Sequence, residues 1–124
     1  MRALIFIGLG GFFGSIARYL TGQFFARYVF HPLPAGTLAV NLVGALLIGL
    51  IIGLGEKYEW FSEPWHFFLA IGFCGSFTTF STFAYENYVL IKEGHISTLI
   101  FYVAFSFIAG MLLAWAGYEF AKWI

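Results

Sequence analysis

Charge is what this sequence has least of. Aspartate is absent, and acidic and basic residues together make up only 10% of the chain, against about 25% in an average soluble protein. A soluble chain of 124 residues needs a polar outer shell, which so few charges cannot supply. The lack of aspartate also removes the usual acid of a Ser–His–Asp triad. With no phosphate-binding loop and no metal-ligand spacing among the three histidines, the sequence predicts no enzyme.

The chain also has no net charge and only one cysteine. The formal net charge is zero, so the chain lacks the basic patch by which nucleic-acid-binding proteins are recognised. The single cysteine, Cys74, excludes an intrachain disulfide. These absences leave membrane proteins as the class that fits the composition.

Long charge-free stretches dominate the chain instead. Hydrophobic residues make up 61%, and no Asp, Glu, Lys or Arg occurs in residues 3–17, 29–55, 64–85 or 94–118. A helix that crosses the ~30 Å hydrocarbon layer needs about 20 residues. Three of the stretches are long enough, and the first is long enough if Arg18 lies within the span or near its end. The sequence therefore predicts an all-α membrane protein, a single domain over residues 1–124, with four transmembrane helices near residues 3–28, 35–54, 64–91 and 96–123.

The loop charges give almost no preference for one orientation. With four spans, Arg2, Lys57 and Lys122 fall on one side of the membrane and Arg27 and Lys92 on the other. Lys and Arg in short loops normally favour the cytoplasm. Such a balance is compatible with insertion in both orientations, and hence with an antiparallel dimer, but a small number of charges also gives a noisy count.

Glycine is abundant, with 15 residues. Gly10 and Gly14, and likewise Gly49 and Gly53, are four residues apart, the spacing that lets helix backbones approach closely in lipid. Four helices of this length have little interior of their own. We therefore expect these glycine faces to be used between the two subunits of a dimer.

The most unusual segment is residues 72–83, within the third predicted span. Two glycines and a run of hydroxyl and β-branched residues make a poor helix. A break would expose backbone groups in mid-membrane, which is tolerated where they line a cavity and often serves to hold ions. A continuous helix whose hydroxyls bond to the preceding turn fits the composition equally well.

Side chains able to contact an anion lie in the second and third spans. Phe80 and Phe83 are three residues apart, so they share a helix face, and the edge of a phenylalanine ring carries positive charge. Asn41, one turn after Thr37, could donate its amide to an anion. Each also has a structural reading: phenylalanines commonly pack or face lipid, and a buried amide can join two helices by a hydrogen bond.

Further polar candidates lie near these spans. Tyr102 and Ser106, with Gly110 one turn further, form either a hydroxyl track or a small-residue helix interface. Glu86, one turn after Thr82, marks either a pore mouth or the polar end of the helix. Arg18 is either a cation in a vestibule or a side chain that snorkels to the membrane surface.

Three segments together resemble the Fluc (CrcB) family of fluoride channels. They read GFFGSIARY at residues 11–19, GTLAVNLVG at residues 36–44 and GFCGSFTTFSTF at residues 72–83. They occur in the family's order, and the length and number of spans also agree. The third segment is highly specific, and the resemblance covers the whole chain.

The resemblance implies an antiparallel, dual-topology homodimer with two pores and a third helix broken in mid-membrane. Phe80, Phe83 and Asn41 are similar to the family's ion-pathway residues. A structural sodium ion would lie on the dimer axis, held by the backbone carbonyls of Gly75 and Thr78. The polar groups that align beside the path are Ser81, Thr82, Glu86, Tyr102 and Ser106. Thr37, in the second motif, and Arg18, in the first, are further candidates for the ion pathway. Gly110 is a departure, because a serine or similar residue is expected there.

The function implied is passive, fluoride-selective export from the cytoplasm across the cell membrane, with no nucleotide and no nucleic acid involved. Fluoride is strongly hydrated, so amide, hydroxyl and ring-edge donors must replace its water without binding it too tightly for release. A small multidrug-type exporter is the chief alternative, but it needs a buried carboxylate in its first helix, and the first acid here is Glu56. A structural membrane subunit is the second alternative, and the polar residues within the spans argue against it.

Overall fold

The computed structural model describes residues 1–61 and 63–124 of the chain. The helices are α1 (Arg2–Tyr28), α2 (Ala35–Lys57), the 3₁₀ turn η1 (Glu59–Phe61), α3 (Glu63–Trp65), the π-helix η2 (His66–Cys74), α4 (Gly75–Phe77), α5 (Phe80–Lys92) and α6 (Ile96–Trp123). We refer to α3, η2, α4 and α5 together as the third span. Position 62, in the predicted connection before this span, lies outside the described residues.

Four stretches of helix in the described chain are long and apolar enough to cross a membrane. The predicted all-α architecture with four spans is therefore confirmed, and the first and fourth spans agree with α1 and α6 to within a residue. The second helix was predicted to end near Leu54, but α2 continues to Lys57. Lys57 stabilises this extension, because a cation in the last turn faces the negative end of the helix dipole.

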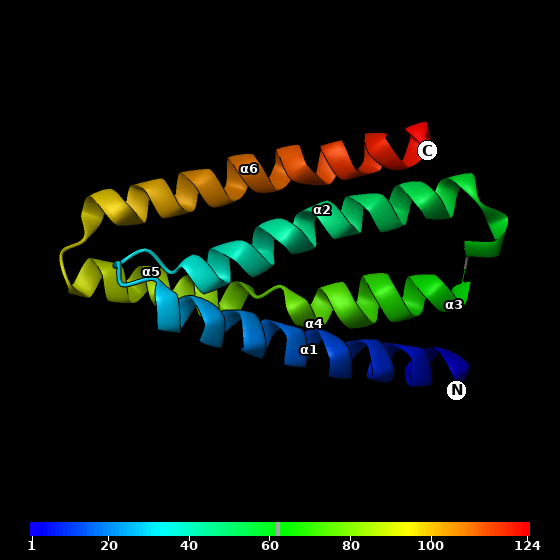
Figure 1. Cartoon of the computed structure of the whole chain (residues 1–124), viewed down its shortest axis with the longest axis horizontal. Helices are drawn as coiled ribbons and strands as arrows, with labels where there is room; N and C mark the ends of the chain where they lie inside the picture. Colours follow the sequence, from blue (N-terminus) through cyan, green and yellow to red (C-terminus); the bar gives the residue numbers. More distant parts are fainter. Residues whose placement is uncertain (62) are drawn as a thin grey trace.

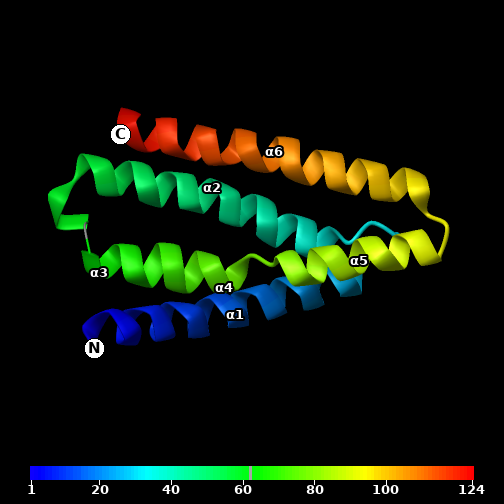
Figure 2. The same cartoon turned by 180° about the vertical axis from the view of Figure 1, so that it is seen from behind.

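The four spans form two pairs of parallel neighbours (Figure 1). α2 lies beside α6, and α1 lies beside the third span, an arrangement that is also visible from behind in Figure 2. Both termini and the connection between α2 and α3 are at the same end of the bundle. At that end the Lys57 ammonium donates to the carbonyl of Lys122 at 3.1 Å and the Tyr118 hydroxyl donates to Glu56 at 2.6 Å. These bonds fasten the end of α6 to the end of α2.

Glycine makes the closest contacts within each pair. A Cβ added to Gly10 or Gly14 of α1 would collide with carbonyl oxygens of the third span, at Phe68 and Phe73. Gly49 of α2 meets the backbone of α6 in the same way. The expectation that these glycine faces serve the contact between two subunits is therefore wrong. They allow helices of one chain to touch backbone to backbone, because only glycine leaves room for a neighbouring carbonyl.

Little of the chain is buried within the single subunit. The largest fully buried side chains are Tyr102 and Val40. One small apolar cluster joins α2 to η2 around Ile51 and Cys74, and another joins α5 to α6 around Phe83 and Leu90. The outer faces of α1 and α6 carry many exposed large apolar side chains, which suits a protein whose surroundings are lipid or other membrane helices.

Candidate functional site

The third span is not helical throughout. α4 ends at Phe77 and α5 begins at Phe80. Between them Thr78 has φ −79° and ψ 159°, and Thr79 has φ −150° and ψ 125°, so both residues are extended. Figure 1 shows this non-helical link near the middle of the bundle's length.

Thr79 starts the helix that follows the link. Its hydroxyl oxygen accepts the backbone N–H of Thr82 at 3.3 Å and its hydroxyl pairs with that of Thr82 at 3.1 Å. This is a side-chain N-cap of α5. This role was not predicted from the sequence, although threonine is among the residues preferred at helix N-caps.

Asn41 of α2 binds the backbone of Thr79 at two points. Its Oδ1 accepts the Thr79 N–H at 2.8 Å, and its Nδ2 donates to the Thr79 carbonyl at 3.1 Å. The amide thus joins α2 to the third span, which is the structural reading considered for it. Nδ2 carries a second N–H, and Asn41 also lines a cavity, so the same side chain retains a donor that is not used in this pair.

The backbone carbonyls of Gly75 and Thr78 lack the partners that a continuous helix would provide. An uninterrupted helix would bond the Thr79 N–H to Gly75 and the Thr82 N–H to Thr78. Here Asn41 and the Thr79 hydroxyl take those two donors. Among the hydrogen bonds of the described residues, none ends on either carbonyl oxygen.

A cavity of about 430 Å³ lies beside the link. Its lining includes Asn41, Gly75, Thr78, Phe80, Phe83 and Ser106, and none of its lining residues carries a charge. The Ser106 hydroxyl oxygen is buried and has no hydrogen-bond partner among the described residues. The cavity is thus an uncharged space bordered by an amide, an unpaired hydroxyl and phenylalanine side chains.

The two phenylalanines differ in their surroundings. Their ring centroids are 6.2 Å apart, but Phe80 is 75% exposed and Phe83 only 9%. Phe83 packs against Tyr102, with ring centroids 4.9 Å apart, and lies edge-on to Phe107 at 6.3 Å. Phe83 is therefore fixed within the subunit, whereas Phe80 projects from it. Nothing in the sequence analysis had singled out Phe107.

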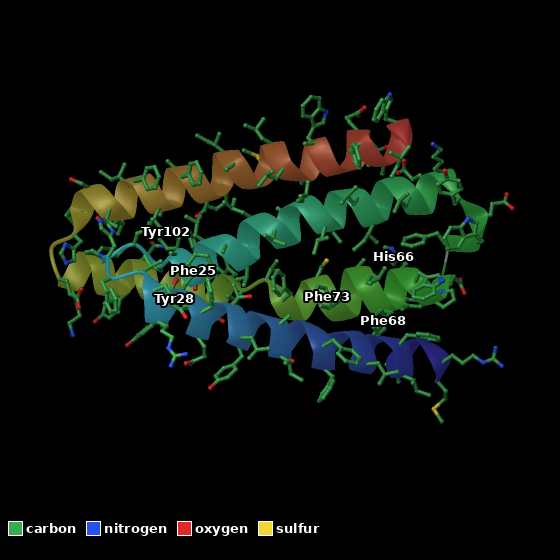
Figure 3. All side chains as sticks on the ribbon, viewed as in Figure 1. Phe25, Tyr28, His66, Phe68, Phe73 and Tyr102 are labelled. Carbon is green, nitrogen blue, oxygen red and sulfur yellow. The ribbon has the colours of Figure 1, made fainter. Side chains whose placement is uncertain are left out.

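Glu86 joins α5 to two other helices. Its Oε1 accepts the hydroxyl of Thr37 in α2 at 2.6 Å, and its Oε2 accepts the hydroxyl of Tyr102 in α6 at 2.9 Å. Tyr102 is fully buried, and Figure 3 shows it between α6 and the rest of the bundle. Both carboxylate oxygens are therefore held by hydroxyl donors.

The remaining predicted site residues lie around the same helices. A second cavity of about 470 Å³ is lined by Arg18, Thr37, Thr82 and Glu86 among others. Ser81 is exposed and lines none of the cavities described here. Tyr102 and Ser106 are not joined to each other, because Tyr102 bonds Glu86 whereas Ser106 lines the first cavity.

One further polar residue was missed. Asn87 donates its side-chain N–H to the carbonyl of Phe83 at 2.9 Å, and its Oδ1 is buried with no partner in the described chain. Its one hydrogen bond is to the preceding turn of its own helix α5, a local contact that no motif in the sequence singles out.

Comparison with known proteins places the chain among small membrane proteins of the same length. The family described as "CrcB-like protein, Camphor Resistance (CrcB)" matches residues 5–118. A Leptospira interrogans protein named "Fluoride-specific ion channel FluC" is 42% identical over 116 residues, which are 94% of this chain and 91% of the relative. Proteins of the same name from Flavobacterium psychrophilum and Bacteroides fragilis are 39% and 41% identical, covering 98% and 94% of this chain and equal shares of their own lengths.

Proposed function

The chain belongs to the CrcB family, and from this we propose that it is a fluoride-selective channel, a multi-pass protein of the cell membrane that exports fluoride passively from the cytoplasm. The observation that carries the proposal is the similarity to fluoride channels over nearly the whole chain. The uncharged, donor-lined cavity beside Thr78 and Thr79 supports it. A pore for a small anion needs donors that replace water yet release the ion.

We propose that fluoride passes along the polar groups of α2, α5 and α6. Asn41 contributes its unused N–H, and Phe80 and Phe83 present ring edges, whose partial positive charge attracts an anion. The unpaired hydroxyl of Ser106 is a further donor on the cavity wall. The groups that continue this path toward the membrane surface are Thr37, Ser81, Thr82, Glu86, Tyr102 and Arg18.

We further propose that the link at Thr78 and Thr79 lies in mid-membrane and that two copies associate as an antiparallel, dual-topology homodimer with two pores. The strong exposure of Phe80 and Phe107, which both line the cavity, supports a second subunit on this face. The near balance of Lys and Arg between the two ends supports insertion in both orientations.

A structural sodium ion between the subunits completes the proposal. Carbonyl oxygens are the ligands that hard cations prefer, and Gly75 and Thr78 offer carbonyls with no other hydrogen-bond partner, so the residues present fit such an ion. No group of three or more His, Cys, Asp or Glu side chains converges in the part of the chain that the structure describes. The ion would supply positive charge at the centre of a path for anions.

Efflux from liposomes that contain only this protein tests the proposed function. Purified chain should release fluoride far faster than chloride, with no nucleotide and no proton gradient, because the cavity offers donors but no charged side chain. Equal rates for the two anions would contradict fluoride selectivity.

Labelling of single cysteines tests the topology separately. Cys74 is first replaced by alanine, and a cysteine is then placed at His31 or at Glu93, near one end of the bundle. Each position should react with an impermeant reagent from both sides of the membrane. Reaction from one side alone would rule out dual topology without affecting the proposed fluoride selectivity.

A further inference from the structure

Asn41 occupies the place of a backbone partner. In an α-helix the Thr79 N–H would bond to the carbonyl of Gly75, four residues earlier. In this chain Asn41 Oδ1 accepts that N–H at 2.8 Å, and Nδ2 donates to the Thr79 carbonyl at 3.1 Å. The side-chain amide therefore pairs with Thr79 as a neighbouring strand would, through one donor and one acceptor.

The first consequence concerns Gly75. Its carbonyl loses its helical donor to Asn41, and no other hydrogen bond of the described residues ends on it. A bare carbonyl in a membrane span is costly unless it lines a cavity or meets another partner. Gly75 does line the cavity beside the link.

The second consequence concerns Thr78. The Thr79 N–H and the Thr78 carbonyl belong to the same peptide unit, and the described chain has no cis peptide bond. In a trans peptide these two groups point in opposite directions. Because the N–H points toward Asn41, the Thr78 carbonyl points away from α2.

From these two consequences we propose that Asn41 is the positioning residue that keeps the carbonyls of Gly75 and Thr78 bare and directs the Thr78 carbonyl away from α2. This inference rests on the proposed function in one respect, since these carbonyls are the proposed sodium ligands. It adds a role for Asn41 beyond donation to fluoride. The Asn41 side chain would then act at both sites, as a donor to fluoride and as the residue that positions the sodium ligands.

Gly44 provides independent support from the same face of α2. A Cβ added to Gly44 would collide with the side-chain methyl of Thr78. Gly44 is three residues after Asn41, so both lie on one face of the helix. The glycine lets α2 approach the link closely enough for the Asn41 amide to reach Thr79.

Two substitutions of Asn41 test whether its side-chain acceptor, rather than its size, keeps the link extended. Asn41→Asp keeps an oxygen that accepts the Thr79 N–H, whereas Asn41→Leu has a similar size but neither acceptor nor donor. In Asn41→Leu the Thr79 N–H should return to the Gly75 carbonyl and close the helix. In Asn41→Asp the link should stay extended.

Solid-state NMR of labelled protein in lipid measures this directly through the ¹³Cα and ¹³Cβ shifts of Thr78 and Thr79. Extended shifts are expected in the native chain and in Asn41→Asp, and helical shifts in Asn41→Leu. Extended shifts at both residues in Asn41→Leu would overturn the inference. If Asn41→Leu does not fold, Asn41→Ala, which also has neither acceptor nor donor, replaces it with the same expected shifts and the same contradicting result.

Sodium binding gives a second readout, as the rise in unfolding temperature when sodium replaces N-methylglucamine. Loss of two hydrogen bonds should weaken the apparent sodium affinity of Asn41→Leu by about tenfold or more, while Asn41→Asp should bind sodium at least as well as the native chain. Equal sodium affinity in Asn41→Leu and the native chain would contradict the inference. A native chain that shows no response to sodium would refute the proposed sodium site, and the NMR shifts would still decide the role of Asn41.

Discussion

The two halves of the third span pack in opposite ways. Before the link, η2 lies against α1 with backbone touching backbone, and Gly10, Gly14 and Gly72 leave no room for a side chain between the helices. Figure 3 shows Phe68 and Phe73 in this half, where the third span runs along α1. After the link, α5 packs against α6 through side chains, with Phe83 beside Tyr102.

The half before the link therefore serves to hold the helices together, and the half after it carries the side chains that can act on an ion. Close backbone contact fixes the first half firmly but leaves few side chains free to act in the interface. The second half keeps its side chains between the helices, where Glu86 binds hydroxyls from α2 and α6 and Phe83 borders the uncharged cavity. Because the helix is interrupted at Thr78 and Thr79, the two halves of one span can pack in these two different ways.

The largest effect on stability is expected where the first half touches α1. Gly14→Ala places a methyl group against the Phe73 carbonyl, and overpacking of this kind costs about 1–3 kcal/mol. The rigid backbone on the other side argues for the upper end of that range. Thermal or denaturant unfolding in detergent measures the loss.

Gly8→Ala is the matched control on the same helix. A Cβ at Gly8 meets nothing within 4 Å, so the better helix propensity of alanine should leave the protein equally stable or stabilise it by up to about 1 kcal/mol. A Gly14→Ala protein as stable as the Gly8→Ala protein would show that the first half does not depend on close backbone contact.

A smaller effect is expected in the second half, from Glu86→Gln. The carboxylate accepts hydroxyls on both oxygens, whereas an amide has only one oxygen and turns a donor toward the other hydroxyl. A buried hydroxyl whose O–H loses its acceptor costs about 1–3 kcal/mol. Tyr102→Phe should cost less, because it removes one bond to the carboxylate and leaves the bond from Thr37 intact. If Tyr102→Phe destabilised the protein more than Glu86→Gln in the same unfolding assay, Glu86 would not be the centre of this contact.

The smallest effect is expected from Gly110→Ser. A Cβ at Gly110 meets nothing within 4 Å, so stability should change by no more than about 0.5 kcal/mol. The added hydroxyl lies one turn beyond Ser106 and would restore the residue type that the family resemblance implies. Fluoride flux should stay the same or rise slightly in the liposome assay. A severe loss of flux would mean that the fourth helix needs glycine at this position.

Much of the fold followed from the sequence because membrane spans are strong signals. The four charge-free stretches predicted all four spans. The use of the glycines was predicted wrongly, since spacing such as that of Gly10 and Gly14 indicates close packing but not which helix supplies the partner. Only the three-dimensional pairing of α1 with the third span decides that.

The sequence predicted which residues belong to the candidate site, but not the hydrogen bonds that they make. The unusual composition of residues 72–83 drew attention to the link, and Asn41 was a polar outlier in an apolar helix. Its pairing with Thr79 across 38 positions of sequence could not be predicted, because it depends on the distance between two helices. The same applies to the bond between Thr37 and Glu86.

The claim that ions move along the second half of the third span is tested most directly by comparing fluoride efflux from liposomes for Phe83→Ile and Phe73→Ile. Both replace a ring in aromatic contact, since Phe73 stacks on Phe77 with centroids 5.4 Å apart, but only Phe83 lines the cavity. If the Phe83 ring lowers the barrier for fluoride by about 1.4 kcal/mol, its loss makes the flux about tenfold lower in Phe83→Ile. Phe73→Ile should stay close to the native rate, because Phe73 does not line the cavity. Native flux in a folded Phe83→Ile protein, or an equal loss in both variants, would contradict the account.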